Sequence, residues 1–276
     1  MTFDVDDYLA RIGRTETRAQ TPATPRTLAA LMRAHLFAIP FENLDPLTGQ
    51  VPSLGLDDLA AKLVTGGRGG YCYEHNTLFA AVLRELGFDV TLLAGRVLAG
   101  VRAGAVRPRS HMLLSVRFPD EPAPYLADVG FGASGALLDP IPLVADVELD
   151  DAPRRHRLLR EDGRGPLPWW ALQSSADGGW ASLYTFTEEP FRAADFRMFN
   201  WYVATYPGSP FRTAPYVQRT GAERHLELSG TTLTERRVDG TRTVRELADP
   251  DELVRVLRTE SDIDVPARFA EAQKEK

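Results

Sequence analysis

Apolar residues recur at the spacing of amphipathic helices through the first third of the chain. One helix face is formed by Leu28, Leu31, Met32, His35 and Leu36. Pro40 ends this pattern, because a proline cannot continue a helix. Similar spacing recurs over residues 56–63 and 78–86, and glycines follow both stretches. We therefore expect a compact bundle of three short helices over residues 1–87.

The period shortens after this region, from that of helices to that of strands. Short apolar or alternating runs, separated by Gly, Pro and charged residues, are typical of antiparallel strands. They cover residues 90–98, 111–118, 124–129 and 182–190. A turn is indicated at Asp162-Gly163. The pattern predicts a barrel-like antiparallel sheet over residues 88–190.

The remaining residues, 191–276, predict a connecting segment, a small sheet and a helix. Alternating runs over residues 225–229, 232–238 and 241–247 predict three strands, with Asp239-Gly240 as a hairpin turn. One helix is expected to follow, with Asp249 as its N-cap and Pro250 at its first position. The polar tail from residue 271 onward is expected to be frayed. The chain as a whole is predicted to be an α+β protein.

The composition is that of an ordinary globular protein. The 276 residues, 43% hydrophobic and 25% charged, are enough for roughly two domains. A net charge of -6, a pI near 5.5 and scattered basic residues argue against a nucleic-acid or membrane partner. The first residues do not resemble a secretory signal, and no run approaches the length of a membrane span. A single cysteine excludes an internal disulfide, which predicts a cytoplasmic protein.

That cysteine, Cys72, lies between a glycine run and the third predicted helix, in GGRGGYCYEHN at residues 66–76. A free cysteine is most often a small buried hydrophobic residue. Here four glycines and Arg68 leave the backbone approachable, and a helix N-terminus favours a thiolate over a thiol. We therefore consider Cys72 a candidate nucleophile, which needs a histidine to take its proton.

Four of the five histidines are weaker candidates for that base. His35 lies on an apolar helix face, where a core role is expected. His156 is expected in an arginine-rich turn, and His225 opens a C-terminal strand. His75 is three residues from Cys72 and could approach the sulfur, but no carboxylate is evidently placed to orient it.

The fifth, His111, opens the predicted strand 111–118, where its ring can face a cleft. Asp128 closes the strand 124–129 within an apolar run, where an unpaired carboxylate would be costly. Neighbouring strands of a meander would bring these two residues together. The alternative is that Asp128 only caps a turn at the strand end.

Other motifs contribute less. The glycines of residues 130–135 match GxGxxG, but two prolines and no helical pattern follow, which argues against a dinucleotide-binding fold. Such a turn can still offer N–H groups to a pyrophosphate. One cysteine with one nearby histidine makes at best half of a zinc site, so no metal is expected. Phe41, Phe131 and Phe211 lie beside Pro or Gly in loops and could line a pocket or belong to the core.

Six segments follow one another along nearly the whole chain: IPFENLDPL (39–47), RGGYCYEHN (68–76), SHMLLSV (110–116), LADVGFG (126–132), LYTFT (183–187) and WYVATYPGSPF (201–211). In this order and spacing, they give the chain a close resemblance to the arylamine N-acetyltransferases. The RGGxCxExN motif is specific, whereas the others alone are not. The resemblance implies a helical bundle, a central barrel, and a C-terminal α/β lid. It also implies a cysteine-protease-like triad of Cys72, His111 and Asp128.

The resemblance implies further site residues. An acceptor pocket would be lined by Phe41, Val97, Phe131 and Phe211, and coenzyme A would contact Ser110, Gly130 and Gly132. Many relatives have Thr before the catalytic His, and Ser110 keeps the hydroxyl. Arg68 and Glu42 are expected to form a structural ion pair that braces the nucleophile loop.

The function that follows from the resemblance is ping-pong transfer of an acetyl group through Cys72. The donor would be acetyl-CoA and the acceptors arylamines, hydrazines or arylhydroxylamines, with no resident cofactor and no metal. A related alternative is a biosynthetic amide synthase that closes a polyketide macrolactam with the same triad. A thiol hydrolase is disfavoured because an apolar pocket excludes water. A non-catalytic protein would be expected to lack a triad member, and a homo-oligomer is left open.

Overall fold

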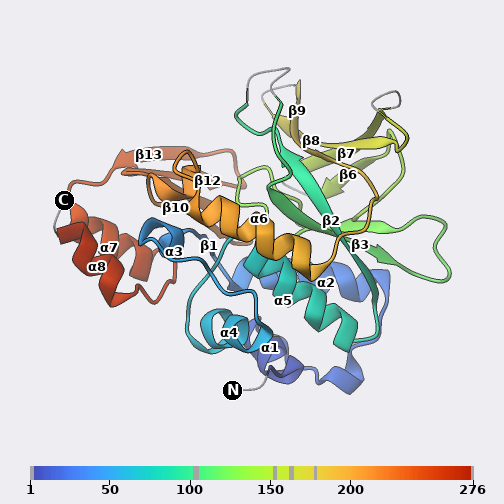
Figure 1. Ribbon diagram of the computed structural model, residues 1–276, viewed down its shortest axis with the longest axis horizontal. Coiled ribbons are helices and arrows are strands. Elements are labelled where there is room, and N and C mark those ends of the chain that lie inside the picture. The colour runs from blue at the N-terminus through green and yellow to red at the C-terminus, as the bar shows by residue number, and fades with distance from the viewer. Residues whose placement is uncertain (1–2, 102–105, 152–153, 162–164, 177–178, 275–276) are drawn as a thin grey trace.

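The chain folds into a helical end, a strongly curved sheet and a smaller sheet backed by helices (Figure 1). The computed structural model describes residues 3–101, 106–151, 154–161, 165–176 and 179–274. The expected α+β architecture with a bundle, a barrel and a C-terminal α/β part is confirmed. The domain limits at residues 87/88 and 190/191 stay a prediction, and the turn expected at residues 162–163 lies outside the described residues.

The helical end packs around α5, whose apolar face is buried on every turn. Its elements are α1 (Val5–Arg11), η1 (Arg18–Gln20), α2 (Pro25–Ala38), α3 (Leu44–Leu47), α4 (Leu56–Leu59), η2 (Ala60–Thr65) and α5 (Cys72–Glu85). The helix predicted over residues 56–63 is a short α-helix that continues as the π-helical turn η2. α1 was not predicted, since only seven residues carry its pattern.

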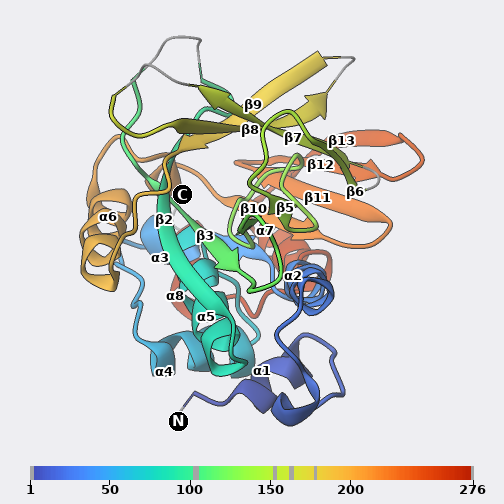
Figure 2. The ribbon, with the colours of Figure 1, turned by 90° about the vertical axis from the view of Figure 1, so that its right-hand side faces the viewer.

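Eight strands form one antiparallel sheet that nearly closes into a barrel, in the order β5-β4-β3-β2-β9-β8-β7-β6 (Figure 2). They are β2 (Asp89–Val97), β3 (His111–Arg117), β4 (Tyr125–Ala127), β5 (Ile141–Pro142), β6 (Glu148–Asp151), β7 (Arg154–Glu161), β8 (Trp169–Ala176) and β9 (Gly179–Phe186). In β3 and β4, Leu114 pairs with Ala127. This register brings the end of β4 toward the start of β3, as the sequence predicted.

A second sheet pairs a short strand of the N-terminal region with the strands of the C-terminal region. Its order is β1-β10-β11-β12-β13, so a strand from the N-terminal region forms one edge. The strands of this sheet are β1 (Phe41–Glu42), β10 (Tyr216–Thr220), β11 (Arg224–Ser229), β12 (Thr232–Arg237) and β13 (Arg242–Glu246). The helices of the C-terminal part are α6 (Ala193–Thr205), η3 (Pro210–Arg212), α7 (Pro250–Thr259) and α8 (Ala267–Lys274). Pairing of Phe41 with Gln218 ties this sheet to the segment that precedes the nucleophile loop.

Three details of the sequence prediction are wrong. Two helices follow the second sheet instead of one, and the tail is helical through Lys274 because Phe269 packs into the core. His156 lies on β7 rather than in a turn, where its side chain is fully buried and its Nε2 bonds the Gly135 carbonyl oxygen at 2.8 Å. The surrounding arginines hid the alternation of that strand.

Burial divides the apolar side chains into two groups. A large core joins the helices to the eight-stranded sheet, and a smaller one lies between the second sheet and helices α7 and α8. Leu44 belongs to the smaller core although it precedes the nucleophile loop in sequence. Within the described residues, no helix has both the length and the apolar character needed to cross a bilayer.

The N-cap of α7 gives a test of how the smaller core is held. Asp249 accepts a hydrogen bond from the Glu252 backbone N–H at 2.8 Å, as predicted. Asp249→Ala removes this cap and should lower the free energy of unfolding by about 1 kcal/mol, measured by urea denaturation. Asp251→Ala is the matched control, because Asp251 lies in the same first turn without a capping bond. Equal losses in the two variants would contradict the capping role.

Candidate active site

Cys72 is the first residue of α5, and its side chain is 4% exposed. The loop before it runs beside β1, where the Glu42 N–H donates to the Gly70 carbonyl oxygen at 2.8 Å. The first residues of a helix have N–H groups without intrahelical partners. The sulfur therefore lies at the positive end of α5, directly after a loop that is held by the backbone of β1.

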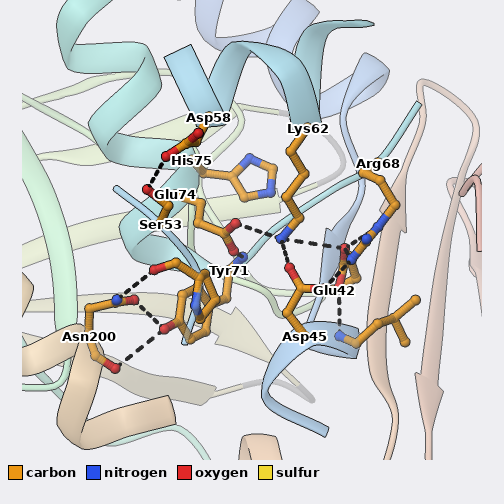
Figure 3. Close-up of polar contacts among 12 residues, drawn as sticks. Glu42, Asp45, Ser53, Asp58, Lys62, Arg68, Tyr71, Glu74, His75 and Asn200 are labelled. Carbon is orange, nitrogen blue, oxygen red and sulfur yellow. Dashed lines mark hydrogen bonds and ion pairs between the residues drawn. The ribbon is translucent and has the colours of Figure 1, made fainter. Parts of the chain in front are cut away.

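A buried glutamate closes this end of α5. Glu74 accepts a hydrogen bond from the Tyr71 N–H at 3.1 Å through one oxygen, and from Lys62 Nζ at 2.6 Å through the other (Figure 3). Burial raises the pKa of Glu74 to about 7, although the Lys62 ammonium opposes that shift. Lys62 comes from the π-helical turn η2, so this turn supports the nucleophile loop.

Beside Glu74 lies a cluster of buried ion pairs (Figure 3). Arg68 Nε is 2.9 Å from Glu42 Oε1, so the ion pair expected from the sequence is present. Asp45 is 2.7 Å from Lys62 and 3.0 Å from Arg68. Burial would raise the pKa of Asp45, but these two cations outweigh it and lower the pKa to about 2. The cluster joins β1, α3 and η2 around the loop that carries Cys72.

His111 and Asp128 form a second buried pair, with exposures of 3% and 1%. His111 opens β3, and its Nε2 lies 2.6 Å from Asp128 Oδ2. Asn76 donates from Nδ2 to Asp128 Oδ1 at 3.0 Å, and the Gly130 N–H donates to the same oxygen at 2.9 Å. Asn76 is one turn along α5 from Cys72, so the nucleophile helix also positions the carboxylate.

The charges of this pair reinforce one another. Burial lowers the pKa of His111, but the Asp128 carboxylate outweighs burial and raises it to about 10, with a contribution from Cys72. Burial raises the pKa of Asp128, yet His111 and Asn76 bring it below its usual value. Both shifts favour an imidazolium paired with a carboxylate.

Cys72 and His111 line the same cavity. The Cys72 Sγ lies 3.9 Å from the carbonyl oxygen of Ser110, the residue before His111. Because Nε2 of His111 is bound to Asp128, Nδ1 is the ring nitrogen left to face the sulfur. The geometry brings together the three residues that the sequence predicted as a catalytic set.

The neighbouring histidines are arranged differently. His35 Nε2 and His75 Nδ1 are 2.7 Å apart, and Tyr8 Oη lies 2.8 Å from the other nitrogen of His35. His75 Nε2 is 3.2 Å from the Pro40 carbonyl oxygen. Burial lowers the pKa of His75 to about 4, and burial also lowers that of His35. Both rings are neutral and fully engaged, so His75 is not placed to serve the sulfur.

The cavity has a volume of about 590 Å³. Its lining includes every residue predicted for substrate or coenzyme A: Phe41, Val97, Phe131, Phe211, Ser110, Gly130 and Gly132. The two glycines also have a packing reason, since a Cβ on Gly130 would lie 2.7 Å from Cys72 Cα and one on Gly132 would lie 2.6 Å from the Phe41 ring. Asp128 lies behind His111 and does not reach the cavity.

Several residues of the site were missed in the sequence. Asn76 and Glu74 lie within the RGGxCxExN motif, but which groups they meet depends on contacts with β4 and η2. Tyr202, Tyr206 and Tyr216 line the cavity from distant segments. Arg107 lines it from the segment between β2 and β3. Across the described part of the chain, no group of three or more His, Cys, Asp and Glu residues is placed to hold a metal ion.

Comparisons with known proteins show which family the chain resembles over most of its length. A family profile described as N-acetyltransferase matches residues 25–270. The arylamine N-acetyltransferase of Mycolicibacterium smegmatis is 40% identical over 251 residues, which cover 89% of this chain and 86% of that protein. The solved structure of the Nocardia farcinica arylamine N-acetyltransferase has a TM-score of 0.89 and 41% identity, covering 98% of this chain and 93% of its own.

A third similar structure was solved with a bound ligand. The solved structure of Mycobacterium marinum arylamine N-acetyltransferase in complex with CoA has a TM-score of 0.89 and 36% identity, with 98% of both chains covered. Both the sequence and the fold of the chain are similar to those of these matches. The chain therefore belongs to the arylamine N-acetyltransferase family.

Proposed function

We propose that this enzyme transfers an acetyl group from acetyl-CoA to an arylamine, a hydrazine or an arylhydroxylamine through Cys72. The observation that carries the proposal is the buried His111–Asp128 pair, of which His111 lines the same cavity as Cys72. The M. marinum relative bound to CoA supports coenzyme A as the carrier of the acetyl group. No resident cofactor or metal is part of the proposal.

In the first half-reaction, the Cys72 thiolate attacks the carbonyl carbon of the acetyl thioester. A bond between Cys72 Sγ and the acetyl carbon forms, and the bond from that carbon to the sulfur of CoA breaks. The His111 imidazolium gives its proton to the departing sulfur, so CoA leaves as a thiol. Asp128 stabilises the imidazolium and fixes which ring nitrogen faces the reaction.

In the second half-reaction, the amine attacks the acetyl carbon on Cys72. The neutral His111 ring takes a proton from the amine, and Cys72 leaves as a thiolate, which restores the starting ion pair. During both steps negative charge develops on the acetyl oxygen. The free N–H groups at the N-terminus of α5, next to Cys72, are proposed to stabilise it.

The cavity supports the proposed substrate contacts. Phe41, Val97, Phe131 and Phe211 give an apolar surface for an aromatic ring, which also disfavours water as the acceptor. The backbone at Gly130 and Gly132 and the hydroxyl of Ser110 are proposed to contact coenzyme A. A reducing cytoplasm is the proposed location, because the mechanism requires Cys72 as a free thiol.

The amide synthase and hydrolase alternatives are not proposed. Among the described residues, no feature of the cavity favours a macrolactam product or water over an aromatic amine. Both alternatives use the same three residues, so they would differ in the acceptor and not in the acyl-enzyme step.

The acyl-enzyme can be observed directly. Acetyl-CoA without an amine should raise the mass of the protein by about 42 Da, the mass of one acetyl group replacing a proton. Because the chain has one cysteine, mapping the adduct to Cys72 is unambiguous, and Cys72→Ser should abolish it. Adding an arylamine should return the unmodified mass and yield the acetylated amine. An unmodified wild-type protein after prolonged incubation would refute the proposal.

The charge of His111 gives a second test, by nitrogen NMR of the imidazole rings. At about pH 8 the His111 ring should be charged, whereas His35, His75 and His225, whose pKa values are lowered by burial, should be neutral. Asp128→Asn should make the His111 ring neutral at the same pH, because the carboxylate raises its pKa. A neutral His111 in the wild type would show that the pair is not ionised.

The same pair makes stability depend on pH with a defined sign. The pKa of His111 in the folded protein, about 10, lies above its ordinary value of 6.5, so folding tightens proton binding. The stabilisation that comes from the protonated His111 ring should be complete at about pH 6.5 and lost as the pH rises through about 10, provided that Asp128 stays ionised. Urea denaturation should therefore show that Asp128→Asn lowers the free energy of unfolding more near pH 6.5 than near pH 10.

A further inference from the structure

Arg107 is a charged residue that lines the cavity in addition to the proposed ion pair of Cys72 and His111. It lies four residues before His111, on the segment that joins β2 to β3. Among the described residues that line the cavity, it is the one with a permanent charge, since a guanidinium stays protonated in proteins. Its neighbours there are mostly apolar or aromatic, including Val97, Phe131 and Phe211.

The Arg107 side chain is half-buried and has no hydrogen-bond or ion-pair partner among the described residues. Its Nε is buried and makes no hydrogen bond, and no carboxylate of the described residues pairs with its guanidinium. A buried donor of a charged group is costly to leave unsatisfied, because it has lost its hydrogen bonds to water without gaining others. Natural proteins rarely keep such a group unless something else satisfies it.

Two nearby arginines show that partners exist in this region. Arg109 pairs with Glu189 at 2.6 Å and lies over the Phe191 ring at 4.9 Å. Arg96 lies over Trp169 at 5.6 Å and donates from Nη1 to the Arg107 carbonyl oxygen at 2.5 Å. The backbone of Arg107 is thus anchored while its side chain is not. The held backbone keeps the guanidinium at the cavity, and its donors are left available to an anion.

From this we infer that Arg107 binds an anionic oxygen group of a substrate in the cavity and so sets substrate preference. The inference rests on the proposed function and extends it. Carboxylates and phosphates both match the planar fork of a guanidinium. The group could be a carboxylate on the ring of the arylamine or a phosphate of coenzyme A. The shared chemistry is an oxyanion that satisfies the Arg107 donors when the substrate enters.

Two pairs of substrates, each with a charged and an uncharged member, show whether the anionic group belongs to the acceptor or to coenzyme A. The acceptor pair is 4-aminobenzoate and its uncharged amide, and the donor pair is acetyl-CoA and S-acetylpantetheine, which lacks phosphates. In ping-pong kinetics, kcat/KM for the acceptor reports the second half-reaction and kcat/KM for the donor reports the first. Each pair therefore tests one source alone.

Arg107→Gln should lower kcat/KM for the charged member of one pair by about tenfold to a hundredfold, the range for hydrogen bonds to charged groups. The uncharged member of that pair should change little, and the loss should appear mainly in KM, because the interaction exists in the bound ground state. Arg107→Lys should recover part of the loss by keeping the charge. Arg109→Gln is the matched control and should show no selective loss, because its guanidinium is paired outside the cavity.

A selective loss with 4-aminobenzoate would identify an acceptor carboxylate as the ligand, and one with acetyl-CoA would identify a phosphate. Equal changes for both members of both pairs, or the same selectivity in Arg109→Gln, would overturn the inference. Calorimetric titration of CoA and of 4-aminobenzoate gives a readout without turnover, in which Arg107→Gln should weaken one ligand. Normal acetylation of Cys72 with unchanged binding would reject the Arg107 role alone, whereas failure of wild-type acetylation would reject the proposed function.

Discussion

The structure depends on one buried ion pair, the contact between His111 Nε2 and Asp128 Oδ2 at 2.6 Å. Neither residue would keep its charge in this setting alone, since burial lowers the pKa of a histidine and raises that of an aspartate. Together each stabilises the charge of the other. The pair is assembled from β3 and the end of β4, and Asn76 of α5 holds the carboxylate, so it forms only when barrel and bundle are packed together.

A second set of buried charges holds the loop that precedes Cys72. It consists of Glu42, Asp45, Lys62, Arg68 and Glu74. It does not line the cavity, and it connects β1, α3 and η2 to the loop that precedes Cys72. Breaking such a cluster by removing one partner leaves an uncompensated buried charge, which is strongly destabilising. The nucleophile is thus placed by α5 on one side and by this cluster on the other, while the reacting groups remain at the cavity surface.

The sequence was sufficient for the order of the three parts, a helical bundle, a barrel and an α/β part. It also predicted that His111 and Asp128 lie together near Cys72, because each lies at the end of a helix or strand with a clear pattern. Their catalytic role stays a proposal. The sequence was not sufficient for Asn76 or Lys62, whose roles depend on which side chains three-dimensional packing brings to them. His156 was placed in a turn because the surrounding arginines hid the strand alternation. The edge strand β1 could not be predicted, since two residues carry no periodicity and its partner β10 is far away in sequence.

The most direct test of the central claim is the rate at which iodoacetamide alkylates Cys72 near pH 6. As the chain has one cysteine, the rate reports that residue alone. If the Asp128 carboxylate sustains an imidazolium beside the sulfur, the wild type should react at least about tenfold faster than Asp128→Asn, since only the thiolate is the nucleophile. Circular dichroism would establish that both proteins are folded. Equal rates in the two folded proteins would contradict the account.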